Sequence, residues 1–159
     1  MGCDIHWYSE TRHKGKWECD QASTMKKETL EDKIYSEMQY FPGRGRDYWL
    51  FGLLAEVCTQ WDWSISAKGF PEDASPEVQQ VYTQWEDGVH TPSYLNRTEL
   101  QALKDTMATA CTQALIDPNA DDETRVVASY LAARVQEILN TLKADVPPED
   151  QRVVFWFDS

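Results

Sequence analysis

The sequence predicts an α+β fold in which a small antiparallel sheet, made by the two ends of the chain, is covered on one face by about four helices. Three observations lead to it. Residues 2–10 alternate in polarity with the period of a half-buried strand. Residues 152–158 read Arg-Val-Val-Phe-Trp-Phe-Asp, a composition typical of a strand. Several helix-start signals lie between them, and 159 residues match a single domain over 1–159.

The start of the chain predicts a β-hairpin. Two sets of side chains alternate, with Cys3, Ile5 and Trp7 on the apolar face and Asp4, His6 and Tyr8 on the other face. Residues 12–15 form a polar break that ends in glycine, and residues 16–19 resume the alternation. On this pattern the His6 ring lies on the polar face, so its removal is expected to leave no cavity.

The first half of the chain then predicts two helices of different character. Residues 21–40 are polar and carry Leu30, Ile34 and Met38 at four-residue spacing, which fits a weak surface helix. Residues 41–46 contain Pro and two Gly and are expected to form a loop. Asp47 is a suitable N-cap for the apolar run 48–57, which is apolar nearly all round and is expected to be buried.

The second half predicts three more helices and the closing strand. Ser75, followed by a proline, marks one helix start, and residues 86–93 after that helix are expected to form a loop. Asn96 and Glu99 form a capping box for the next helix. Residues 121–122 begin the longest helix, and the Pro-Pro pair at 147–148 lies just past its end.

Composition excludes several classes of function. A net charge of −12 argues against a general DNA- or RNA-binding surface, because phosphate contacts need clustered Lys and Arg. The four cysteines form no CxxC pair, so neither a zinc knuckle nor a redox motif is indicated. No apolar stretch approaches the roughly 20 residues of a membrane span. We therefore expect a cytoplasmic protein without a membrane partner.

Four residues could form one polar site. Asp4 and His6 share a strand face at i, i+2 spacing, and Asp158 joins them if the last strand pairs beside the first. His90 lies in a glycine-containing loop, where functional side chains are common. The four could hold a divalent metal through nitrogen and carboxylate ligands, or act as a general acid/base group. No GxSxG, HExxH, P-loop or GxGxxG motif accompanies them.

Arg44 and Arg46 form a second candidate site. They stand just before a predicted helix start, where backbone N–H groups favour a phosphate. Trp61, Trp63, Trp85 and Tyr94 lie near irregular segments, and such a ring could stack on a nucleotide base. The alternative is that the arginines only neutralise an acidic surface by pairing with Asp47 or Glu10.

Short islands along the whole chain resemble a family of small, uncharacterised phage and bacterial proteins that begin with MGCDIH. These islands are the first six residues, Arg46-Asp47-Tyr48 with Leu50-Phe51, Gly69-Phe70-Pro71 with Asp73 and Ser75, His90 before Ser93-Tyr94-Leu95, and residues 152–158. The resemblance implies no activity. It does imply a phage setting, and so the cytoplasm of a host cell.

The leading hypothesis is a phage-type accessory protein, with an anti-defence role, that sequesters a small phosphorylated, nucleotide-like ligand. The ligand-binding residues expected for it are Asp4, His6, Arg44, Arg46, His90, Ser93, Tyr94 and Asp158. One alternative is a metal-dependent hydrolase of a nucleotide or phosphoester that uses Asp4, His6, His90 and Asp158. A second alternative is an acidic protein that inhibits a host factor by direct contact.

Overall fold

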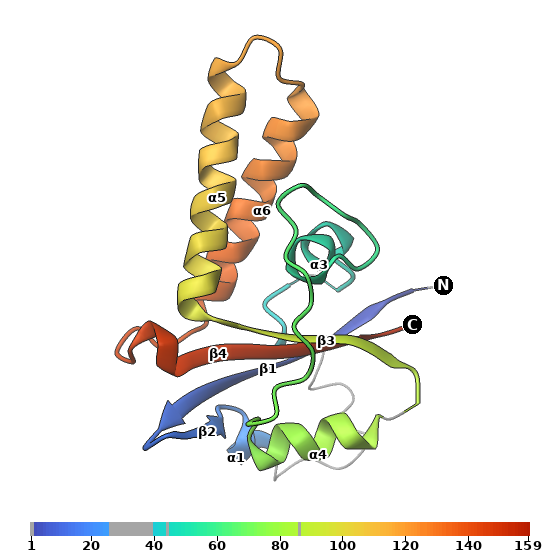
Figure 1. The fold of residues 1–159 in the computed structure, drawn as a ribbon, viewed down its shortest axis with the longest axis vertical. Coiled ribbons are helices and arrows are strands. Elements are labelled where there is room, and N and C mark those ends of the chain that lie inside the picture. Colours follow the sequence, from blue (N-terminus) through green and yellow to red (C-terminus); the bar gives the residue numbers. More distant parts are fainter. Residues whose placement is uncertain (1, 26–39, 44, 86) are drawn as a thin grey trace.

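The chain folds around a four-stranded antiparallel sheet with strand order β2-β1-β4-β3 (Figure 1). The structure is a computed structural model, and it describes residues 2–25, 40–43, 45–85 and 87–159. The strands are β1 (Asp4–His13), β2 (Lys16–Cys19), β3 (Val89–Asn96) and β4 (Gln151–Asp158). The predicted α+β class and the sheet built from the two chain ends are confirmed.

β1 and β4 lie side by side at the centre of the sheet. Their register runs from Asp4 opposite Asp158 to Thr11 opposite Gln151, so the two termini emerge at the same end of the sheet (Figure 1). β1 turns into β2 through Lys14 and Gly15, which have φ angles of 51° and 78°. Two successive positive φ angles match a tight two-residue hairpin. The predicted hairpin is therefore confirmed.

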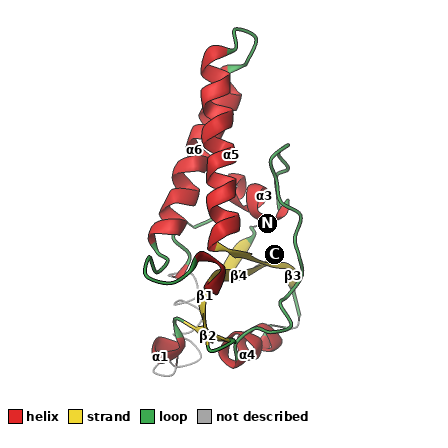
Figure 2. Ribbon diagram, turned by 60° about the vertical axis from the view of Figure 1, so that its left-hand side comes forward, coloured by secondary structure: helices red, strands yellow, loops and turns green. Residues whose placement is uncertain are grey.

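Helices cover both faces of the sheet, not the single face expected from the sequence (Figure 2). On one face, α3 (Tyr48–Ala55), α5 (Arg97–Ile116) and α6 (Asp122–Asn140) enclose the larger core, to which β1 contributes Ile5 and Trp7. On the other, α4 (Pro76–Gln84) covers a smaller core that includes Tyr8 and Trp156. Both faces of β1 are consequently buried.

The helix starts follow the predicted capping residues. Asp47, Ser75 and Asp121 each accept a backbone N–H from the first turn, and Asn96 with Glu99 forms the capping box of α5. α5 and α6 form a long antiparallel hairpin that stands away from the sheet (Figure 1). None of the described helices is both long enough and apolar enough to cross a bilayer.

One segment differs from its predicted structure, and another lies mostly outside the described residues. Residues 89–96 form β3, although residues 86–93 were predicted to be a loop. β3 is an edge strand that bulges between His90 and Ser93, and an edge strand tolerates the Pro at position 92 that obscured its pattern. Of the helix predicted over 21–40, the short α1 (Ala22–Met25) is observed, and residues 26–39 lie outside the described part.

A short 3-10 helix, η1 (Pro148–Asp150), leads from the end of the hairpin into β4. It brings Asp150 next to Arg12 of β1, and their side chains form an exposed ion pair. The last strand is thus tied to the first at this end as well as by the ladder between them.

Candidate functional site

The candidate site lies at the end of the sheet where β1 begins and β4 ends. Asp4 of β1 and Asp158 of β4 are direct cross-strand partners and share the face that also carries His6 and Trp156. Like charges directly opposite one another destabilise a sheet unless they are neutralised. Here each carboxylate has its own partner, Arg46 for Asp4 and His6 for Asp158. We call Asp4, His6, Arg46 and Asp158 the sheet-end cluster.

Arg46 binds Asp4 through two parallel hydrogen bonds. Its Nε and Nη2 donate to Oδ1 and Oδ2 of Asp4 over 2.9 and 3.1 Å. This hydrogen bonding lowers the pKa of the Asp4 carboxyl below its usual value. Gly2 leaves room for the guanidinium, because a Cβ added there would lie 1.9 Å from Cζ of Arg46. Arg46 is therefore fixed in place, yet its side chain stays 51% exposed.

His6 binds Asp158 and is itself buried. Its Nε2 lies 2.6 Å from Oδ2 of Asp158. A carboxylate oxygen only accepts, so Nε2 carries the proton of this bond. The ring stacks on Trp156 at 5.6 Å and contacts Trp85 at 4.9 Å, and the residue is 6% exposed. The expectation of an exposed imidazole was wrong, because α4 and the residues after it cover this face of the sheet.

The burial of His6 changes the expected effect of its removal. His6→Ala is expected to lower the free energy of unfolding by about 1–3 kcal/mol, since the ring leaves a gap and Asp158 loses its hydrogen bond. Urea denaturation of the purified variant measures this loss. His13→Ala is the control, because His13 is exposed at the end of β1 and should change stability by less than about 0.5 kcal/mol. A loss equally small for His6→Ala would contradict the packing described here.

His90 does not join the sheet-end cluster on the same face. It pairs with Phe157 and therefore points to the opposite face from Asp158. Its ring stacks against Phe157, while Nδ1 and Nε2 contact the hydroxyls of Thr91 and Ser159 at 2.9 and 2.7 Å. Within the described part of the chain, no group of three or more His, Cys, Asp or Glu side chains is arranged to hold a metal ion.

Ser93 and Tyr94 lie further along the sheet. Ser93 is fully buried, and its hydroxyl accepts the backbone N–H of Lys68 over 3.0 Å. Tyr94 carries the ammonium of Lys68 over its ring at 4.0 Å. Tyr94 is paired with Val154, four residues along β4 from Asp158, which places it roughly 13 Å away along the strand. The structure therefore separates both residues from the sheet-end cluster.

Of the two arginines predicted to bind a phosphate together, the structure describes only Arg46. Arg44 lies outside the described residues. The acids suggested as alternative partners of Arg46 are engaged elsewhere, because Asp47 caps α3 and Glu10 binds Arg152. The phosphate site expected at this loop consequently depends, within the described chain, on Arg46 alone.

A buried polar network at the opposite end of β1 was not anticipated. Glu10 accepts hydrogen bonds from Arg152 Nε at 2.8 Å and from the backbone N–H of Ser75 at 2.7 Å. Arg152 also binds Asp73 at 2.9 Å and lies over the Trp17 ring. The only sequence signal was a charged residue inside each of two strands. The contacts join β1, β2, β4 and residues 73–75, and they serve the fold.

Comparison with known proteins yields no matching family model, no matching curated protein and no matching solved structure. The sheet-end cluster is therefore interpreted from its own geometry.

Proposed function

We propose that the chain binds and sequesters a small phosphorylated, nucleotide-like molecule at the sheet-end cluster. The observation that carries the proposal is the state of Arg46, which is held by Asp4 and still half exposed. A guanidinium has five N–H donors, and Asp4 takes one from Nε and one from Nη2. The Nη1 edge can fork onto two phosphate oxygens while Asp4 keeps the side chain in position.

The surroundings support a ligand with both a phosphate and a ring. Asp158 would repel a phosphate, and the hydrogen bond with His6 holds that carboxylate on its own side of the cluster, away from Arg46. Trp85, only partly buried, packs on the covered His6 ring and could extend the stacking surface to a base. The resemblance to phage-encoded proteins supports an anti-defence role, in which a sequestered signal no longer reaches its receptor.

Arg46→Gln is expected to weaken binding of a nucleoside monophosphate by about 1.5–3 kcal/mol, a factor of roughly 10–150, because one charge-assisted contact is lost. Calorimetric titration of the nucleotide and of its unphosphorylated nucleoside measures this. Gly2→Ala should act in the same direction, since its Cβ pushes the guanidinium away without changing its charge. Arg12→Gln is the matched control, because that exposed arginine pairs with Asp150 at the far end of β1.

The nature of the captured molecule is tested by heating the purified protein and analysing what it releases. An intact nucleotide supports sequestration, and a cleaved one supports the hydrolase alternative. Binding that is unchanged in Arg46→Gln would refute the phosphate site. No released molecule and no nucleotide binding would refute capture altogether.

A second candidate function is binding to a protein, and one observation favours it. Five large apolar side chains are exposed on α3 and on the outer part of the α5–α6 hairpin. They are Trp49, Leu115, Ile116, Val126 and Tyr130. Four of them lie on the projecting hairpin, and the fifth, Trp49, contacts the ring of Tyr130 at 5.4 Å. Contiguous exposed apolar side chains are typical of an interaction surface. A net charge of −12 favours a basic partner for the acidic inhibitor of that hypothesis.

A further inference from the structure

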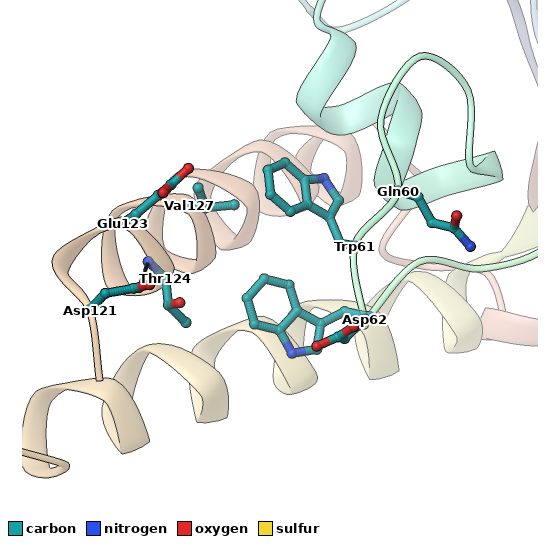
Figure 3. Close-up of a pocket in the computed structure, with 8 residues that line it drawn as sticks. Gln60, Trp61, Asp62, Asp121, Glu123, Thr124 and Val127 are labelled. Carbon is teal, nitrogen blue, oxygen red and sulfur yellow. Dashed lines mark hydrogen bonds between the residues drawn. The ribbon is translucent and has the colours of Figure 1, made fainter. Parts of the chain in front are cut away.

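A pocket lies between the loop that follows α3 and the beginning of α6. It has a volume of about 250 Å³ and lies away from the sheet-end cluster. Residues 60–63 form one wall, and Asp121, Glu123, Thr124 and Val127 form the other. Figure 3 shows the indole of Trp61 reaching from the loop toward Val127 and Glu123 of α6.

Two indoles, those of Trp61 and Trp63, give this pocket an aromatic lining. Both are partly buried against the larger core. The Trp61 indole N–H donates to the backbone oxygen of Trp49 over 3.0 Å, and its backbone N–H donates to Ser64 Oγ over 2.8 Å. The ring is therefore held at its N–H, and the backbone that carries it is held as well. The negative faces of such rings attract cations, and tryptophan does so best among the aromatic residues.

The charges around the pocket have a single sign. Asp62, Asp121 and Glu123 line it, all three are exposed, and none of its described lining residues is basic. Asp121 caps α6, and hydrogen bonding with Thr124 lowers the pKa of its carboxyl, so it stays ionised at neutral pH. The helix start offsets only about half a charge. Arg125, the nearest basic residue along α6, is paired with Asp122.

We propose that this pocket binds an organic cation, a guanidinium or alkylammonium group. The indoles supply a π surface for the delocalised charge, and the carboxylates at the opening supply the opposite charge. An anion would meet three carboxylates, and a neutral apolar group would gain nothing from them. The cation could be a free small molecule or the side chain of an Arg or Lys on a basic partner. The proposal does not depend on the function of the sheet-end cluster.

The test compares butylguanidinium with butylurea, its neutral counterpart of nearly the same shape, by NMR of the full chain. Butylguanidinium is expected to shift the indole N–H signals of Trp61 and Trp63 in a saturable way, and butylurea is expected not to. Equal shifts from both compounds would overturn the proposal, because they would show an apolar cavity indifferent to charge. The absence of a saturable shift with butylguanidinium would overturn it as well.

Variants separate the contribution of the indole rings to cation binding from that of the carboxylates. Trp63→Leu is expected to weaken butylguanidinium binding about 3- to 30-fold. Asp62→Asn with Glu123→Gln should weaken it by a further, smaller factor of about 3 to 10. The control pair is Asp105→Asn with Glu149→Gln, two exposed acids that do not line the pocket. If Trp63→Leu fails to fold, the double variant of Asp62 and Glu123 is the deciding test. Butylguanidinium binding that is unchanged in this double variant overturns the proposal.

A short Gly-Arg-Gly peptide distinguishes the two sources of the cation. Tighter binding of the peptide than of butylguanidinium would assign the pocket to a side chain of a protein partner. Equal or weaker binding would assign it to a free small cation. Both results support a cation site, and the comparison with butylurea remains the outcome that can refute it.

Discussion

Replacing Arg152 by Met is expected to lower the free energy of unfolding by about 3–5 kcal/mol. Arg152 is 4% exposed at its side chain and pairs with Glu10, which is 0% exposed. Removing one partner leaves the other as an uncompensated buried charge, which costs far more than the pair itself contributes. For a domain of this size the loss corresponds to a fall in Tm of about 6–20 °C, measured by calorimetry.

Two further variants test the cause of that loss. Arg125→Met is the matched control, because Arg125 forms an exposed pair with Asp122 and should cost less than about 1 kcal/mol. Adding Glu10→Gln to Arg152→Met should restore much of the stability, since it removes the stranded charge and keeps an acceptor for Ser75. A double variant as unstable as the sum of its parts would show that packing, and not the buried charge, dominates.

Trp156→Ala is expected to cost about 3–5 kcal/mol, which again is measurable by urea denaturation or calorimetry. Trp156 is 0% exposed, stacks on Tyr8 at 5.6 Å, and meets the rings of Tyr82 and Phe70 edge-on at 5.2 and 6.1 Å. It is the centre of the smaller core beneath α4. A cost below about 1 kcal/mol would mean that this second core contributes little to the folded state.

Trp156→Phe is the milder comparison. The indole N–H of Trp156 has no hydrogen-bond partner among the described residues, so phenylalanine removes a buried unsatisfied donor along with part of the ring. We expect it to lose less than half as much stability as the alanine variant. A loss equal to that of Trp156→Ala would show instead that the N–H is satisfied in solution and that its bond matters.

The candidate site was predicted in part. The strand period alone placed Asp4 and His6 on one face at i, i+2 spacing. Asp158 joins them because the strand at the end of the chain pairs with β1, as the sequence analysis predicted. His90 was assigned to the same site and points to the other face. Its position depends on the register of an edge strand with a bulge, and no local pattern in residues 86–93 indicates that register.

By itself the sequence determined the fold class, the hairpin, the capped helix starts and the pairing of the two chain ends. The hairpin and the helix starts depend on residues close together in the chain, through turn geometry and capping chemistry. The side-chain period at each end of the chain marks two strands, and their predicted pairing is the one long-range contact among these features. Only the tertiary structure decided that α4 buries the face carrying His6, that Arg46 pairs with Asp4, and that Asp73 and Ser75 join the Glu10–Arg152 pair. Those contacts join segments more than 40 residues apart, and burial and pairing at such separations depend on how whole elements pack together.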